Sequence, residues 1–241
     1  MSYKSIGDYG IIGDLHTIAL VGLDGSIDWC CLPRFDSPSL FGSILDHKAG
    51  GHFKIAPVRE GNTRQMYLPE TNVLLTRFLQ DDGVGELTDF MPVESDEPGY
   101  RPRQHQIIRM VSVVRGQVRF RLECAPAFNY GRDTHTAEKV DKGVIFRTET
   151  GTAALVSPIP LHVGEGTAYL EFVVNQGETL TFFLEYAATT DNIDFRVTPE
   201  SGELALQNTS AFWQRWLGQC QYDGRWREMV HRSALTLKLL T

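Results

Sequence analysis

Short runs of alternating apolar and polar residues make up most of this chain, and they decide what it can fold into. They recur between residues 15 and 190, with turn residues between neighbouring runs and without the regular alternation with helices that a parallel sheet needs. A period of two residues puts successive side chains on opposite faces of a strand. Short connections favour antiparallel pairing, because parallel strands require long crossovers. We therefore predict a mainly β fold, an antiparallel sandwich of about a dozen strands or more.

Two segments give this prediction local detail. Residues 16–31 predict a hairpin, because Asp24-Gly25 separates two β-rich runs and glycine tolerates the positive φ of a tight turn. Residues 105–126 predict two long strands, one on each side of Gly116.

Two glycine-rich segments, residues 7–14 and 82–86, could suggest phosphate-binding loops. Neither follows a strand and opens a helix, and neither carries the lysine of a phosphate-binding loop. We interpret both segments as turns.

The period of the pattern changes near residue 198. Thr198 is a suitable N-cap, Pro199 suits the first helical position, and acidic Glu200 and Glu203 complement the helix dipole. A helix is therefore predicted from this point to Gly218.

The last segment, residues 224–241, predicts a second helix that is apolar on several sides. Its main stripe has helical spacing and consists of Trp226, Met229, Val230, Ala234, Leu237 and Leu240. Leu235 and Leu239 lie off this stripe, so the helix is expected to need neighbours on more than one side. We interpret the chain as the front part of a longer protein with further helices beyond Thr241.

Charge and composition exclude several classes of partner. The net charge is -7, the pI is near 5.5 and no block of Lys or Arg occurs, so nucleic acid and anionic membranes are unsuitable partners. The first residues do not read as a signal peptide, and no apolar run is long enough to span a bilayer. A cytoplasmic location and reduced thiols are expected, since the four cysteines do not form a disulfide framework.

Catalytic and metal-binding motifs are absent from the sequence. The seven histidines form neither an H-E-x-x-H motif nor a pair at i, i+4, and no Cys-x-x-Cys or G-x-S-x-G motif is present. We expect no metal site and no cofactor. Many aspartates are available for acid–base chemistry, but spacing cannot show which carboxylates face each other from different strands.

Residues 24–42 are the strongest candidate for contact with a ligand or partner. They include the aromatic residues Trp29, Phe35 and Phe41 and the charged residues Arg34 and Asp36. Aromatic faces stack on sugar rings, and guanidinium and carboxylate groups bind hydroxyls in a forked geometry. The alternative is that the charged pair only braces a loop between two prolines.

Five segments, taken in order, resemble family 15 glycoside hydrolases, the glucoamylase and trehalase-like enzymes of prokaryotes. They are residues 6–46 (IGDYGIIGDLHTIALVGLDGSIDWCCLPRFDSPSLFGSILD), 50–57 (GGHFKIAP), 87–92 (LTDFMP), 128–133 (FNYGRD) and 212–240 (FWQRWLGQCQYDGRWREMVHRSALTLKLL). The resemblance covers essentially the whole chain.

This resemblance implies a two-domain enzyme. Residues 1–190 would form an antiparallel β-supersandwich similar to that of galactose mutarotase. Residues 191–223 would form a helical linker, and residues 224–241 the first helix of a catalytic (α/α)6 barrel.

The resemblance also implies a reaction. The intact enzyme would hydrolyse an α-glucosidic bond of trehalose or a maltooligosaccharide with inversion, while this chain would be its non-catalytic N-terminal domain. The two catalytic glutamates of the family lie in the barrel beyond Thr241, so no catalytic residue is assigned here and the chain alone is expected to be inactive. Trp29, Arg34, Phe35 and Asp36 are predicted to brace the interface with the barrel or to reach the rim of the substrate pocket.

A second hypothesis is a stand-alone sugar-binding or mutarotase-like sandwich. Such an epimerase needs a histidine and a glutamate that converge in the groove of the sheet. The strand residues offer His105 with Glu123 or Glu171 for this role.

Overall fold

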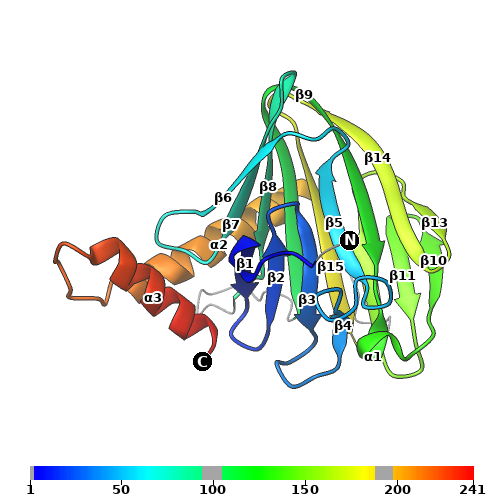
Figure 1. Cartoon of the computed structure of the whole chain (residues 1–241), viewed down its shortest axis with the longest axis horizontal. Helices are drawn as coiled ribbons and strands as arrows, with labels where there is room; N and C mark the ends of the chain where they lie inside the picture. Colours follow the sequence, from blue (N-terminus) through cyan, green and yellow to red (C-terminus); the bar gives the residue numbers. More distant parts are fainter. Residues whose placement is uncertain (1–2, 94–104, 188–197) are drawn as a thin grey trace.

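The computed structural model describes residues 3–93, 105–187 and 198–241, and Figure 1 shows a curled β-rich body with two helices at one side. Residues 94–104 and the beginning of the predicted linker, residues 191–197, lie outside the described residues. The strands are β1 Tyr9–Gly13, β2 Ile18–Gly22, β3 Ser26–Cys31, β4 Ser39–Phe41, β5 His52–Pro57, β6 Asn62–Tyr67, β7 Leu74–Leu79, β8 Gly83–Phe90, β9 Gln106–Ala125, β10 Thr136–Val140, β11 Gly143–Arg147, β12 Thr152–Val156, β13 His162–Gly164, β14 Thr167–Asn175 and β15 Thr179–Ala187. The helices are the 3-10 turn η1 Ile6–Asp8, the short α1 Phe128–Gly131, α2 Pro199–Leu217 and α3 Arg227–Leu239.

Every strand pairing among these elements is antiparallel, which confirms the predicted mainly β, antiparallel class. The longest path through the sheet runs β1-β2-β3-β5-β9-β15-β12-β11-β10. The predicted hairpin is present as β2 and β3, and Gly25 in its turn has a φ of 74°.

Strand β9 joins the two layers of the body. Its first half pairs with β8 and β15, and its second half pairs with β5 and β14. The prediction of two strands here was wrong, because Gly116 does not end the strand. Its φ of 70° gives a conformation that glycine adopts without strain, and pairing continues on both sides of it.

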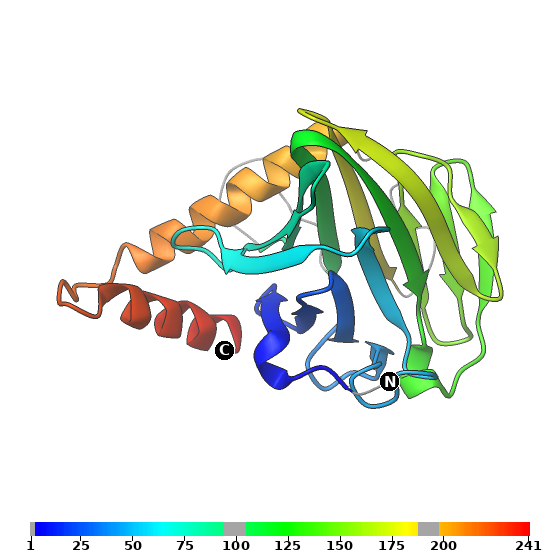
Figure 2. The same ribbon diagram turned by 45° about the horizontal axis from the view of Figure 1, so that its top comes forward.

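The core lies between the two layers (Figure 2). The ring centroids of Phe120 and Phe172, in one layer, are 5.8 Å apart, and Phe172 lies 5.5 Å from Phe182 in the other layer. Phe78 also crosses between the layers, with its ring 6.2 Å from that of Phe120. Aromatic contacts at these distances add to the stabilisation that burial of apolar surface provides.

One fully buried ion pair, between two neighbouring strands of one layer, points into this core. Arg109 Nε donates to Asp89 Oδ1 at 2.8 Å, and both side chains have 0% exposure. The same guanidinium donates to the carbonyls of Phe53 at 2.5 Å and Gly25 at 2.7 Å, which belong to the opposite layer. Burial raises the pKa of Asp89 and Arg109 opposes that shift. The pair therefore ties the layers together through a nearly complete set of hydrogen bonds.

The glycine-rich segments at 7–14 and 82–86 are mostly strand, so their interpretation as turns was wrong. Residues 9–13 form β1, and β8 begins at residue 83. A Cβ atom at Gly85 would lie 2.6 Å from the Phe120 ring. Glycine here makes room for a neighbour's side chain, a packing requirement that resembles a turn signal in the sequence.

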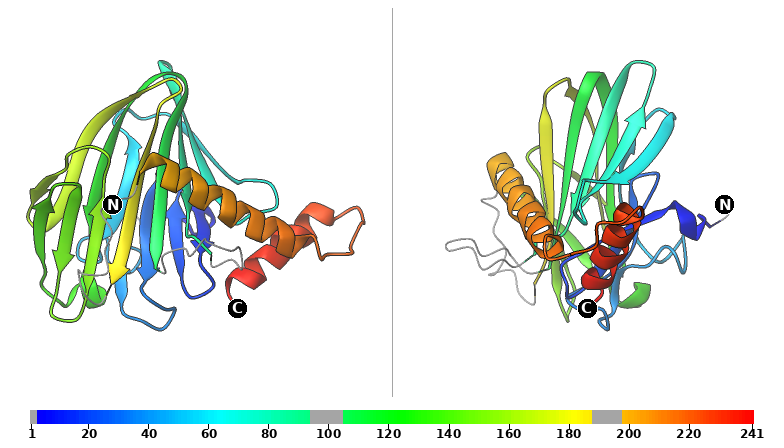
Figure 3. Two further views of the ribbon diagram at one scale, coloured as in Figure 1. Left: turned by 180° about the vertical axis from the view of Figure 1, so that it is seen from behind. Right: turned by 90° about the vertical axis from the view of Figure 1, so that its left-hand side faces the viewer.

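Helix α2 begins as predicted and covers the outer face of one layer (Figure 3). Thr198 Oγ1 accepts a hydrogen bond from Ser201 N, and Ser201 Oγ accepts one from Thr198 N, which completes a capping box. Small side chains allow close packing on the sheet: a Cβ atom at Gly202 would lie 2.7 Å from Thr181 Cγ2, and Ala205 joins a buried cluster with Phe90.

Candidate functional site

The loop predicted to contact a ligand or partner is held mainly by its backbone. Arg34 N donates to Ser37 Oγ at 3.1 Å, and Phe35 N donates to the carbonyl of His16 at 3.0 Å. Arg34 Nε lies 3.5 Å from Asp36 Oδ1, with side-chain exposures of 70% and 80%. An ion pair that is this exposed contributes little to stability. The charged side chains and Phe35 are therefore exposed on this loop.

The three aromatic residues of the segment have different environments. Phe41 has 0% exposure and packs 6.4 Å from Phe53, so it cannot stack on a sugar. Trp29 is half-buried on β3, and its ring centroid lies 6.4 Å from that of Tyr130, a residue that is 43% exposed. The structure therefore groups Trp29 with Tyr130, a neighbour that the sequence did not suggest.

The mutarotase-like alternative does not obtain its predicted histidine–glutamate pair. His105 directly precedes the first residue of β9, whereas Glu123 lies near the last, and Glu171 pairs with Arg121 at the same far end. At about 3.3 Å per residue, a strand stretch of this length separates the groups far beyond contact. Burial lowers the pKa of His105, and Asp14, 4.0 Å away, opposes that shift.

A different histidine–glutamate pair lies on the outside of the sheet. His52 Nε2 is 3.4 Å from Glu123 Oε1, and burial lowers the pKa of His52. These two groups contact each other directly instead of facing each other across a space for a sugar.

The buried residues of helix α3 form one narrow stripe. His231, Leu235 and Leu239 are buried, at exposures of 9%, 2% and 0%. Leu235 and Leu239 belong to a cluster with Trp213 and Leu217 of α2, which β1 and its neighbours complete. The structure therefore buries the two leucines that lie off the predicted main stripe.

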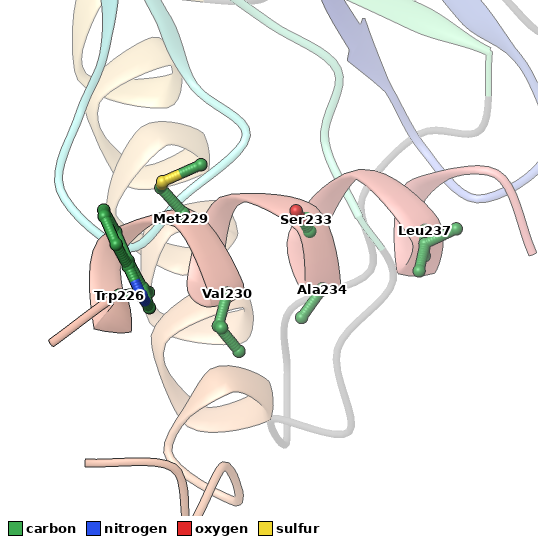
Figure 4. A pocket seen from close by; sticks show the side chains of 6 residues that line it. All are labelled: Trp226, Met229, Val230, Ser233, Ala234 and Leu237. Carbon is green, nitrogen blue, oxygen red and sulfur yellow. The ribbon is translucent and has the colours of Figure 1, made fainter. Parts of the chain in front are cut away.

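The main stripe itself lies on the outside of the molecule. Trp226, Met229 and Leu237 are 55%, 65% and 65% exposed. With Val230, Ser233 and Ala234 they line a shallow groove of about 540 Å³ along α3 (Figure 4). A continuous apolar surface of this kind marks an interaction site in a soluble protein.

Polar contacts connect α3 to residues 68–73, the connection between β6 and β7. Arg232 Nη1 donates to the carbonyl of Thr71 at 2.7 Å, Nη2 donates to Asn72 Oδ1, and the guanidinium lies 3.9 Å from the ring centroid of Tyr67. Asn72 Nδ2 in turn donates to the carbonyl of Leu235 at 3.1 Å. We call these four residues, Tyr67, Thr71, Asn72 and Arg232, the α3 clamp.

The clamp is anchored to β1 and borders a cavity. Tyr67 Oη accepts a hydrogen bond from Ile11 N at 2.8 Å and donates to Ile11 O at 3.0 Å. The adjoining cavity, of about 930 Å³, is also lined by Glu70, whose Oε1 lies 3.6 Å from Arg227 and 3.9 Å from His231. This arrangement can orient a helix.

Two features are absent from the parts of the chain that the structure describes. No group of three or more His, Cys, Asp or Glu residues there could hold a metal ion. No described helix is long and apolar enough to cross a membrane.

Comparison with known proteins gives a consistent family. Residues 2–209 match the family described as "Trehalase-like, N-terminal". The chain is 33% identical over 241 residues to a trehalase of Thermoplasma volcanium and 29% identical over 262 residues to a trehalase of Mycobacterium tuberculosis. Each alignment covers 99% of this chain and 38% of the relative.

Among solved structures, a putative kojibiose phosphorylase from human microbiome superposes with a TM-score of 0.46 at 9% identity. The superposition covers 94% of this chain and 35% of that one. The chain thus spans well under half the length of the proteins that it matches.

Proposed function

We propose, from the premise that this chain belongs to the family of trehalase-like N-terminal domains, that it is the non-catalytic N-terminal domain of a longer, inverting α-glucosidic hydrolase. The relatives are named trehalases, and the chain corresponds to 38% of their length. Trehalose is therefore the proposed substrate of the longer protein, and a maltooligosaccharide is the alternative. The β body would be a supersandwich, and α3 the first helix of an (α/α)6 barrel.

One observation carries this proposal: the largest apolar side chains of α3 lie outside. Trp226, Met229 and Leu237 are more than half exposed, and leaving large apolar side chains in water forfeits about 1.5–3 kcal/mol each. Further helices of the longer protein would cover this groove. The two catalytic carboxylates would then come from those helices, roughly 6.5–9.5 Å apart, so that a water molecule fits between them and the sugar.

Two contacts support the proposal that the loop at residues 33–38 meets the catalytic domain. The backbone N–H of Phe35 in this loop donates to the carbonyl of His16. Leu15, the residue before His16, packs in the same cluster as Leu239 of α3. Arg34 and Asp36 would thus lie beside the first barrel helix, where they brace the interface or reach the rim of the substrate pocket. The proposed location is the cytoplasm, where the four free cysteines would stay reduced.

The test compares this 241-residue chain with the longer protein. We expect the longer protein to release glucose from trehalose with β-glucose as one initial product, as NMR would show, and the chain alone to release none. Leu237→Lys should lower the activity of the longer protein strongly while leaving the melting temperature of the 241-residue chain unchanged. Hydrolysis by the chain alone, or full activity of the Leu237→Lys protein, would contradict the proposal.

The alternative of a sugar-binding sandwich predicts a different result. Calorimetry with glucose and trehalose on the chain alone would then show binding, and Glu123→Gln would abolish it. We expect no binding heat, since His52 and Glu123 contact each other instead of facing a sugar-sized space.

A further inference from the structure

We infer that Arg232 is a positioning residue that fixes the rotation of α3 about its own axis. The inference deepens the proposed function, because the rotation decides which face of α3 the remainder of a longer protein would meet. The rotation can be measured on this chain without an enzymatic assay.

Hydrophobicity alone does not explain the observed rotation. The buried stripe holds one histidine and two leucines, His231, Leu235 and Leu239. The exposed stripe holds larger apolar side chains, including Trp226 and Met229, at the spacing of one helix face. A helix free to turn would bury the stripe with more apolar area. Another interaction must therefore select the smaller stripe.

The α3 clamp supplies that interaction. A guanidinium is a rigid fork, and here both of its terminal nitrogens have partners in the β6–β7 connection while its plane lies against Tyr67. Asn72 is 2% exposed, and its amide group bonds to Arg232 through the oxygen and to the Leu235 carbonyl through the nitrogen. Rotation by one residue, about 100°, would break these bonds and leave buried polar atoms without partners, which is costly.

The anchoring of the clamp makes it a suitable reference for orientation. Tyr67 is bonded to the backbone of β1 through Ile11, so the ring under Arg232 cannot shift independently of the sheet. The ion pair between Arg227 and Glu70 lacks this property, because it measures 3.6 Å and the Arg227 side chain is 57% exposed.

Oxidation of methionine by dilute hydrogen peroxide, followed by peptide mass spectrometry, reports the rotation, because the reaction rate follows exposure of the sulfur. Met229 is 65% exposed, half-exposed Met66 on β6 gives an internal reference, and Met91, at 1%, gives the buried limit. In Arg232→Ala we expect Met229 to oxidise about threefold more slowly or slower still, relative to Met66. The matched control Arg227→Ala should leave the ratio unchanged.

Two results would overturn the inference. A folded Arg232→Ala chain in which Met229 oxidises at the original rate, or faster, would show that Arg232 only stabilises or attaches the helix. If Arg232→Ala fails to fold, as circular dichroism would show, Asn72→Leu removes the bonds of Asn72 to Arg232 and Leu235 while the bond of Arg232 to Thr71 remains. An unchanged rate of Met229 oxidation in this second variant would also overturn the inference. Lack of trehalose hydrolysis by the unsubstituted longer protein would contradict the proposed function and would leave the oxidation result unaffected.

Discussion

The β body and helix α3 solve the burial of charge and of apolar surface in opposite ways. In the body, Arg109 and Asp89 are fully buried with a nearly complete set of partners, and apolar side chains of both layers face each other. On α3, Arg232 is only partly covered, and the larger apolar stripe faces outward. The described part of the body thus buries its charged pair and its apolar side chains among its own residues, whereas α3 buries one face and exposes the other.

The largest effect should come from breaking the buried pair of the body. Arg109→Ala leaves the buried Asp89 carboxylate without its ion-pair partner and removes one hydrogen bond from each of the carbonyls of Phe53 and Gly25. We expect the free energy of unfolding to fall by about 3–5 kcal/mol in urea titrations. Arg119→Ala, on an exposed position of the same strand, is the matched control and should change stability by less than about 0.5 kcal/mol. If the body buries this pair among its own residues, Arg109→Leu combined with Asp89→Leu should recover much of the loss. Equal effects of Arg109→Ala and Arg119→Ala would break the comparison.

The two faces of α3 should differ by a smaller amount. Leu235→Ala opens a cavity in the cluster beneath the helix, and we expect a loss of about 2–4 kcal/mol with faster amide hydrogen exchange throughout α3. Leu237→Ala removes a side chain of the same size from the exposed stripe and should cost less than about 0.5 kcal/mol. Similar losses for the two leucines would show that the outward stripe is already covered in the 241-residue chain.

The polar contacts that hold Lys4 on the body should contribute about 1 kcal/mol to the free energy of unfolding. Burial raises the pKa values of Asp24 and Asp28, but hydrogen bonds from Lys4 and other donors outweigh burial and hold both below the ordinary 3.8. Their folded pKa values lie below the unfolded ones, so this stability is present above about pH 4 and is lost as the pH falls further. In Lys4→Met, thermal melting between pH 2 and 6 should depend less on pH. An unchanged pH profile would rule out this contribution.

The smallest effect on stability should come from Arg34. Arg34→Ala removes an exposed ion pair, so the free energy of unfolding of the chain should change by less than about 0.5 kcal/mol. The melting temperature should therefore hardly change. In the longer protein the same substitution should raise KM, whereas Arg59→Ala, which breaks another exposed pair, should not. Unchanged kinetics and unchanged melting together would remove Arg34 from the predicted interface.

Local signals in the sequence predicted local structure well. The Asp24-Gly25 turn and the cap at Thr198 are fixed by residues close together in the chain, and both are present. Gly116 misled because its left-handed backbone is compatible with a turn and also with a kinked, continuous strand. Only the partner strands distinguish the two, and they come from distant parts of the chain.

The buried ion pair was missed, although the sequence holds a signal for it. Asp89 alternates in phase with the buried residues Leu87 and Met91, so it points to the same inward face of its strand. Arg109 likewise points inward with Ile107 and Val111. Two opposite charges that both point inward indicate a buried pair when their strands are neighbours. The alternation of apolar and polar residues does not predict that β8 pairs with β9.

The rotation of α3 about its axis could not be predicted from the spacing of its apolar residues, for a different reason. A helical stripe predicts which side chains share a face, and the stripe from Trp226 to Leu240 does so. It does not predict which of two apolar faces turns inward. That choice depends on Asn72, which lies 160 residues before Arg232 in the chain.

The contact between β1 and α3 has a consequence for the chain while it is being synthesised. Leu239 lies in one cluster with Ile11 and Ile18, so the two ends of the chain cover each other. A ribosome that makes about 5–20 residues per second needs roughly 10–45 seconds to travel from one end to the other. During that interval the first strand leaves the exit tunnel with no cover on this side, and a nascent-chain chaperone would have its best opportunity to bind there.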